Sequence, residues 1–297
     1  MQLPFVDVII PHLNDHERLG TCLHRLAAQS YPPDCYRVVV VDNGSDRPID
    51  DLVGRFPRSS ATFEAEKGCG TARNRGVAET SGDILAFTDS DCLPDADWIL
   101  NAVARLTHDP VDILAGHIKV FAADERHPTD AELYDKVFGF EPRRYAERKH
   151  FATGANIVVP RAVFQQVGPF RNGWLPEDLD WGRRAHAMGF RIGYAPDVLV
   201  RHPARRSWRE LAGKTVRTAW HSRNYMASAD LFHLRWAAYT LAMASPPLLK
   251  AVQIAMTPEL HGLGQRLRVI KTLLRVRYYR VGVMAGYLFE PRPSDGA

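Results

Sequence analysis

Short apolar runs alternate with amphipathic segments along the first part of the chain. Apolar runs at 5–10, 36–41 and 84–88 are bounded by polar or glycine-containing segments, which is typical of buried strands. Between the first two, Leu19, Leu23 and Leu26 recur at helical spacing. A strand, a helix and a strand in this order form a right-handed βαβ unit, so the pattern predicts an α/β fold with a mostly parallel central sheet flanked by helices.

The pattern continues less regularly to about residue 202. Residues 117–150 are polar and predict no definite element. The remaining segments indicate a helix over 95–106, a strand over 111–116, a strand within 151–160, a helix over 161–167, a helix from Glu177 to Met188 and a strand pair over 191–202.

The C-terminal region differs in charge and in pattern. Residues 1–200 hold 22 Lys and Arg against 29 Asp and Glu, whereas residues 201–297 hold 16 against 5. Helices are expected over 205–228 and 266–280, with an apolar stretch at 236–256 that Pro246-Pro247 interrupts. We expect a first domain over 1–205 and a basic, mostly helical region over 206–297. Such a region is typical of a membrane-surface segment, and the alternative is a helical lid packed on the first domain.

The spacing of the four cysteines argues against two kinds of cysteine site. They show no C-x-x-C pairing, so neither a zinc knuckle nor a disulfide framework is indicated. The N-terminus has no basic and apolar signal-like segment. We therefore expect a cytoplasmic protein, peripheral at the inner face of the cell membrane.

Asp89 and Asp91 follow the apolar strand at 84–88 directly. Open α/β sheets bind ligands at the carboxyl ends of their strands, and two carboxylates on a tight turn can hold Mg²⁺ or Mn²⁺ while leaving positions for phosphate oxygens. The alternative is a helix cap with a second surface carboxylate beside it.

Two other segments have residues suited to a nucleotide. Asp42 ends the second strand just before Gly44, where its carboxylate can accept hydrogen bonds from a nucleoside, or can stabilise its own turn. Lys67 precedes a helix whose first turns contain Arg73 and Asn74. These side chains can face a diphosphate, although a solvated basic helix start is the alternative.

A third acidic group precedes the helix that starts at Glu177. Glu177 and Asp178 follow Pro176 and lie near Trp174 in sequence, so one carboxylate can act as a general base; the alternative is that acids in a first turn only satisfy the helix dipole. His202 ends the last strand segment, and a lone histidine is more often a surface residue than a metal ligand.

Taken in order, these motifs resemble the family 2 glycosyltransferases of the GT-A fold, over Val6 to about His202. The segments that match are Pro11 with Asn14, Val41–Ser45, Ala72–Asn74 with Gly76, Phe87–Asp91, Glu177-Asp178 with Gly189-Phe190, and Pro196–His202. The resemblance implies a Rossmann-like GT-A domain with a helical C-terminal extension.

The resemblance also implies a role for each matched residue. Asp91, Asp89 and His202 would hold a divalent cation, Mn²⁺ or Mg²⁺. Asp178 would deprotonate the acceptor hydroxyl with Glu177 as support. Beside these matched residues, Trp174 and Asn156 are expected to contact the acceptor. The expected nucleotide-sugar site comprises Pro11, Asn14, Asp42, Gly44, Lys67, Arg73, Asn74, Asp89 and Ser90.

The predicted function is inverting transfer of a sugar from a nucleotide-diphosphate sugar to a hydroxyl of a lipid-linked or polymeric glycan. A nucleotidyltransferase would also use paired carboxylates and a basic loop, and would release pyrophosphate. A catalytically silent sugar-nucleotide-binding or scaffold protein is the alternative outside the enzymes. No nucleic-acid-binding motif is present in the sequence, so no nucleic acid partner is expected.

Overall fold

A computed structural model describes residues 3–173, 175–227 and 229–291 and divides into two compact units. The first comprises 1–119 and 141–202, and the second comprises 120–140 and 203–297. The expected first domain covered 1–205 without a break, whereas the first unit ends at His202 and leaves out 120–140. Residues 120–140, for which the sequence predicted no element, belong to the second, helical unit.

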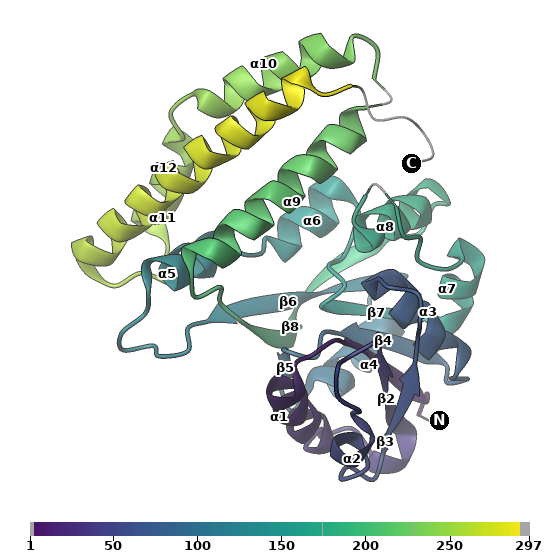
Figure 1. Ribbon diagram of the computed structural model, residues 1–297. Coiled ribbons are helices and arrows are strands. Elements are labelled where there is room, and N and C mark those ends of the chain that lie inside the picture. The colour runs from purple at the N-terminus through teal and green to yellow at the C-terminus, as the bar shows by residue number, and fades with distance from the viewer. Residues whose placement is uncertain (1–2, 174, 228, 292–297) are drawn as a thin grey trace. The chain divides into compact units, whose positions relative to one another are not determined.

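The first unit is built on the sheet that the apolar runs predicted (Figure 1). The strand order is β3-β2-β1-β4-β7-β6-β8-β5. Their bounds are β1 Val6–His12, β2 Tyr36–Asp42, β3 Ser59–Phe63, β4 Ile84–Thr88, β5 Leu93–Pro94, β6 Ile113–Phe121, β7 Asn156–Pro160 and β8 Ile192–Pro203.

The parallel part of the sheet is β3-β2-β1-β4, and β7 pairs with both β4 and β6 in the antiparallel sense. The segment 191–202 forms the single strand β8, not the expected strand pair. It pairs with the two-residue β5, so Leu93-Pro94 continues the sheet after the turn at Asp89–Cys92.

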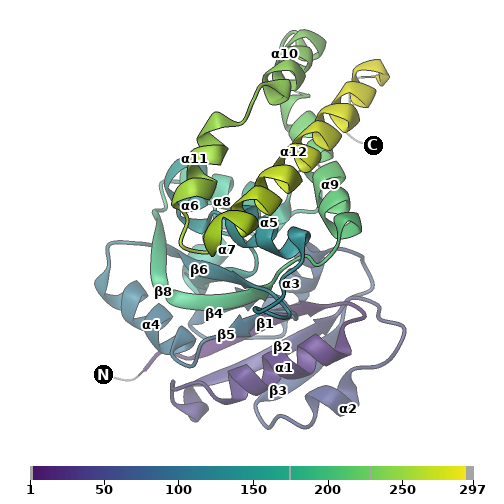
Figure 2. The same cartoon turned by 90° about the vertical axis from the view of Figure 1, so that its left-hand side faces the viewer.

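Helices cover both faces of this sheet because successive strand residues point to opposite sides. Ile9, Val39 and Phe87 face a core that contains residues of α3, α7 and α8. Figure 2 shows α1 and α4 on the near side of the strands. The helices of this unit are α1 His16–Ala27, the one-turn η1 Pro33–Cys35, α2 Asp50–Val53, α3 Cys69–Ala78, α4 Trp98–His108, α6 Pro142–Lys149, α7 Arg161–Val167 and α8 Glu177–Ala187.

The second unit is a helical assembly whose core joins α5, α11 and α12 through Leu133, Ile254 and Val269, among others. Its helices are α5 Asp130–Phe138, α9 Trp208–Met226, α10 Phe232–Ala244, α11 Leu248–Met256, α12 Gly262–Gly286 and the short η2 Tyr287–Phe289. Pro246-Pro247 separates α10 from α11, where the sequence predicted an interruption. Within the described residues, no helix combines the length and the apolar character that crossing a bilayer requires.

Candidate active site

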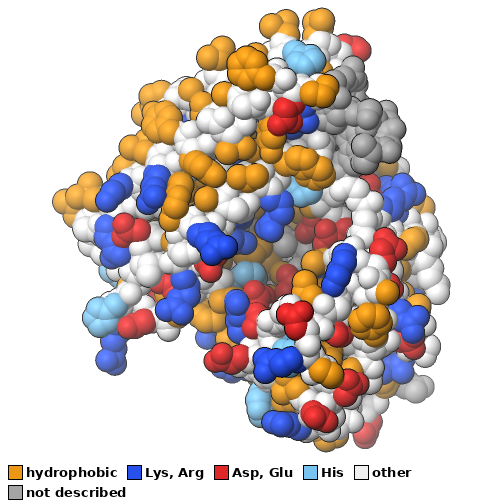
Figure 3. Space-filling view, viewed as in Figure 1, with side chains coloured by type: hydrophobic (Ala, Val, Ile, Leu, Met, Phe, Trp, Pro, Cys, Tyr) orange, Lys and Arg blue, Asp and Glu red, His pale blue; other side chains and the backbone are white. Residues whose placement is uncertain are grey.

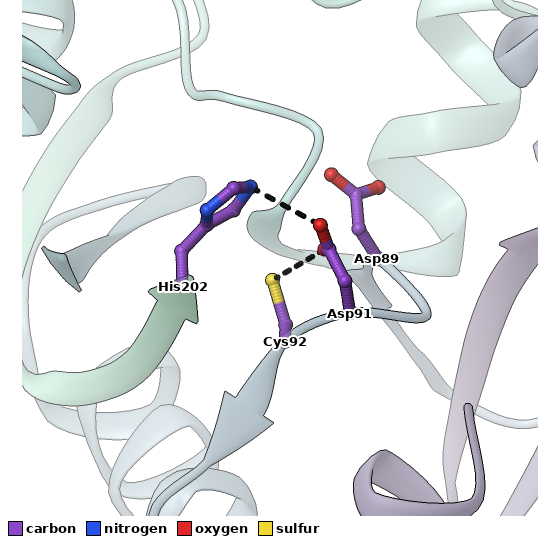
Figure 4. A group of neighbouring side chains, drawn as sticks. All are labelled: Asp89, Asp91, Cys92 and His202. Atoms are coloured by element: carbon purple, nitrogen blue, oxygen red, sulfur yellow. Dashed lines mark hydrogen bonds and ion pairs between the residues drawn. The ribbon is translucent and has the colours of Figure 1, made fainter. Parts of the chain in front are cut away.

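The turn after β4 and the end of β8 bring the expected metal ligands together. Because Leu93 pairs with Arg201, the next residue of β8, His202, lies opposite the Asp89–Cys92 turn. The Nε2 atom of His202 is 3.8 Å from Oδ2 of Asp91 (Figure 4). Ligand atoms of Asp89, Asp91, Cys92 and His202 all lie within 4.8 Å of one another.

The chemistry of this cluster fits a hard divalent cation. Burial raises the pKa of Asp89, and the nearby charge of Asp91 adds to that effect, although Arg73 opposes it. A bound cation would relieve this repulsion. Burial also raises the pKa of the Cys92 thiol, which donates a hydrogen bond to Oδ1 of Asp91 at 3.8 Å. Cys92 is thus a protonated neighbour, and the oxygen and nitrogen donors of Asp89, Asp91 and His202 are the set that suits Mn²⁺ or Mg²⁺.

Arg73 of α3 links the metal-ligand cluster to the acids of α8. Its buried guanidinium donates from Nη2 to Asp89 at 2.8 Å and from Nη1 to Oε1 of Glu177 at 2.6 Å. Burial disfavours the charge, but Asp89 and Glu177 together hold the pKa of Arg73 above its ordinary value. The sequence placed Arg73 opposite a diphosphate, and the structure shows it as the bridge between two carboxylates.

Asp178 lies beside this bridge, in the first turn of α8. Its Oδ2 accepts a hydrogen bond from the backbone N–H of Gly154 at 3.0 Å. Its Oδ1 accepts one from the backbone N–H of the next residue, Leu179, at 2.8 Å. Burial, followed by the charge of Glu177, raises the pKa of Asp178 to about 6. A carboxylate with a pKa near neutrality can accept a proton more effectively than an ordinary aspartate.

The loop that supports Asp178 has no room for a larger residue. A Cβ at Gly154 would lie 2.5 Å from Nη2 of Arg73, so the glycine lets the loop approach both the guanidinium and Asp178. No local sequence signal identifies Gly154, because its close contacts come from α3 and α8, which are distant in sequence.

The loops after β1 and β2 form the expected nucleoside end. Both the N–H of Ser45 and its hydroxyl donate to Oδ1 of Asp42, at 3.1 and 2.6 Å, so Asp42 stabilises its own turn, as its alternative interpretation predicted. Asn14 has a left-handed backbone, with φ of 54°. Its side-chain Oδ1 accepts the N–H of Asp46 at 2.8 Å, and its backbone N–H donates to the Oγ of Ser45 at 2.9 Å. These bonds join the loop that follows Pro11 to the loop around Gly44.

Lys67 also lies at this end, where its Nζ donates to the carbonyl oxygens of Asn43 and Gly44 at 2.8 and 3.1 Å. The partly buried Ser90 lies between Asp89 and Asp91 in the turn. Two further residues, for which no role was predicted, belong to this region. Asn43 is buried and bonded to the 64–68 segment. His12 pairs with Asp42 in the β1–β2 register.

The structure does not bring every predicted residue to the site surface. Asn156 is buried, and its amide bonds Trp98 Nε1 and the carbonyl oxygens of His117 and Val198. Asn74 is bonded through both amide atoms to the backbone of Phe170. These bonds hold the fold together, and the acceptor and diphosphate roles expected for Asn156 and Asn74 stay predictions. Trp174 lies outside the described residues.

Comparisons with known proteins agree with the resemblance found in the sequence. A family model described as Glycosyl transferase family 2 matches residues 7–168. Glycosyltransferase AglE of Haloferax volcanii is 34% identical over 209 residues, covering 68% of this chain and 68% of AglE. Pre-mycofactocin glycosyltransferase of Mycobacterium tuberculosis is 29% identical over 216 residues, covering 69% of this chain but only 44% of that protein.

A solved structure shares the fold over nearly the whole chain. It is the mannosyltransferase PcManGT from Pyrobaculum calidifontis, in complex with GDP-Man and Mn²⁺, with a TM-score of 0.64 and 21% identity. The similarity covers 98% of this chain and 88% of that chain. The α/β architecture with C-terminal helices that the sequence predicted is therefore confirmed as a GT-A type fold.

Proposed function

Because this chain belongs to glycosyl transferase family 2, we propose that it transfers a sugar from a nucleoside diphosphate donor to an acceptor hydroxyl with inversion, using Asp178 as the base. The observation that carries this proposal is that the buried Arg73 bridges Asp89 to Glu177, the residue next to Asp178 at the start of α8. This bridge keeps the proposed base next to the carboxylate that lies at the donor end.

Different residues bind the nucleoside and the metal ion at the donor end. Asp42, with the Pro11–Asn14 and Gly44 loops, binds the nucleoside, and Lys67 lies beside it. Asp89, Asp91 and His202 hold Mn²⁺ or Mg²⁺, which when bound neutralises charge on the diphosphate. The Mn²⁺ and GDP-Man in the PcManGT structure support this assignment.

Asp178 then accepts the proton of the acceptor hydroxyl as the oxygen attacks the anomeric carbon. A new bond forms between that oxygen and the sugar, the bond to the diphosphate breaks, and the electron pair leaves with the nucleoside diphosphate. Glu177, which accepts a hydrogen bond from Arg73, raises the pKa of Asp178 and so its proton affinity. A lipid-linked or polymeric glycan is the proposed acceptor class.

The variant Asp178→Asn tests this assignment. It preserves the shape of the side chain but removes the proton acceptor, so turnover should fall by about 10²- to 10⁴-fold while calorimetry shows nearly unchanged donor affinity. Asp180→Asn is the matched control, because Asp180 lies in the same first turn and pairs with Arg184 at 2.9 Å. Wild-type turnover in Asp178→Asn would reject Asp178 as the base.

We also propose that the helical unit binds the enzyme to the anionic inner face of the cell membrane. Exposed apolar side chains and basic residues occur together on its helices, as Figure 3 shows for one face. The most exposed apolar residues include Leu231 at 70%, Leu241 at 73%, Met256 at 79% and Leu249 at 87%. Apolar area combined with cationic charge favours an anionic lipid surface.

A further inference from the structure

One face of α9 lines a groove within the helical unit. Trp208, Ala212, Val216 and Trp220 recur every four residues and share that face. The groove has a volume of about 700 Å³, and Tyr279 of α12 and Tyr287 of η2 also line it. Figures 1 and 2 both show α9 beside α12.

The middle of this groove is open because its residues are small. Ala212 and Gly213 lie between the two tryptophans, and a Cβ at Gly213 would meet no atom within 4 Å. The groove from Trp208 to Trp220 is about 18 Å long, at 1.5 Å of rise per residue. That length is comparable to one leaflet of the hydrocarbon core, about 15 Å. Its dimensions therefore suit a hydrocarbon chain.

A cationic pocket adjoins the groove at Trp208, which lines both. Its volume is about 210 Å³, and Arg206, Lys271 and Arg275 contribute to its lining. The guanidinium of Arg275 lies 3.9 Å from the centre of the Trp208 ring. Along α12, Lys271, Arg275 and Tyr279 follow at intervals of four residues, so one helix face passes from the cationic pocket to the aromatic groove.

Three carboxylates near this pocket already have partners: Glu210 caps α9 by accepting the backbone N–H groups of Arg206 and Ser207, and the other two have cationic partners. Asp130, which lines the pocket, accepts Arg268 at 2.5 Å, and Glu132 lies 3.7 Å from Arg206. Among the residues that the structure describes, Lys271 and Arg275 have no carboxylate within ion-pair distance, and the same holds for Arg209 and Arg217 along the groove. The pocket therefore keeps an excess of positive charge for an anion.

We propose that the helical unit has a defined site for one anionic phospholipid of the membrane. The phosphate lies among Arg206, Lys271 and Arg275, and one hydrocarbon chain lies along the groove between Trp208 and Trp220. Tryptophan and tyrosine suit this position because each joins an apolar ring to a polar group. The site goes beyond the membrane adsorption proposed above, which requires only exposed apolar area and net charge and no stoichiometric ligand.

The test uses the full chain and dihexanoyl phosphatidylglycerol below its critical micelle concentration, titrated by calorimetry. We expect saturable binding of one lipid per chain. Dihexanoyl phosphatidylcholine and glycerol phosphate, which lack the net charge and the chain respectively, should bind at least about tenfold more weakly. Equal binding of glycerol phosphate would assign the pocket to free phosphate, and absence of saturable binding would overturn the proposal.

Two variants separate the site from general adsorption. Gly213→Leu fills the groove where space is open, so the helix should remain folded and lipid affinity should fall at least about tenfold. Gly282→Leu is its control, because that glycine of α12 also has no atom within 4 Å of a built Cβ and is outside the set of groove-lining residues.

Lys271→Gln should weaken the lipid about fivefold, the equivalent of roughly 1 kcal/mol for one cation at an anionic surface. Arg235→Gln, on the exposed part of α10, is the charge-matched control. Equal loss in each variant and its control would overturn the site. Donor binding, measured separately by calorimetry, tests the glycosyltransferase assignment and should be the same in all four variants.

Discussion

At the scale of single residues, the environment of Asp178 predicts how activity depends on pH. Its pKa of about 6 means that the proton-accepting form is fully present above pH 7 and is lost as the pH falls through 6. At pH 5 about one-tenth of the carboxyl groups remain ionised, so kcat/KM should be about tenfold below its plateau. A pH–rate profile measures this limb, and a profile that is flat between pH 5 and 8 would contradict the assignment.

Asp91 is the residue whose loss should separate metal-dependent from metal-independent donor binding. Replacing Asp91 by Ala removes a proposed oxygen ligand, so the donor diphosphate should lose the charge neutralisation that a bound cation would supply. When the donor is titrated by calorimetry in the presence of Mn²⁺, the Asp91→Ala variant should bind it as weakly as the wild type does in EDTA. Asp51→Ala, an exposed carboxylate on α2, is the control. Unchanged wild-type donor affinity in EDTA would refute the metal requirement.

At the scale of elements, we expect replacement of Asn156 to lower the stability of the fold without changing the affinity for the acceptor. Its side chain joins β7 to α4, β6 and β8 through Trp98, His117 and Val198. Asn156→Ala removes the partner of three groups, each at a cost of about 1–3 kcal/mol, so the free energy of unfolding should fall by at least about 3 kcal/mol.

Denaturant unfolding measures this loss of stability. Asn101→Ala is the control: it removes a single hydrogen bond, to the carbonyl oxygen of Asp197, that is more exposed, and it should cost less than about 1 kcal/mol. The acceptor KM of folded Asn156→Ala should match the wild type. A raised KM with normal stability would instead restore the acceptor-binding role that the sequence suggested for Asn156.

The elements also show how far the sequence could predict this molecule. Apolar runs located β1, β2 and β4 because those strands are buried on both sides, and the acids at their ends were found with them. Residues 117–150 gave no prediction because α5 and α6 are short and polar. The burial of Asp135 in α5, for instance, depends on Arg205 and Lys214, about seventy or more residues away.

Contacts between elements account for the remaining differences at the site. Arg73, Asn74 and Asn156 have side chains suited to ligands, and only their positions in space show that they bond to protein groups. The Leu93–Arg201 pairing that places His202 leaves no local signal either, since β5 has two residues. The resemblance to a family supplied His202 where periodicity could not.

At the scale of the whole molecule, the charge of residues 201–297 predicts salt-dependent membrane binding of the full chain. Each Lys or Arg near an anionic surface contributes about 1 kcal/mol, decaying within a Debye length, whereas exposed leucine and aromatic side chains contribute a part that salt does not screen. In co-sedimentation, anionic liposomes should therefore bind the protein more than neutral ones, and high salt should weaken this binding without abolishing it.

Leu249→Ser, at a residue 87% exposed on α11, should reduce the fraction bound at high salt, whereas Leu100→Ser, at a residue 43% exposed on α4, should not. Folded protein that stays in the supernatant with both kinds of liposome would show that these helices serve as a lid or an oligomer interface.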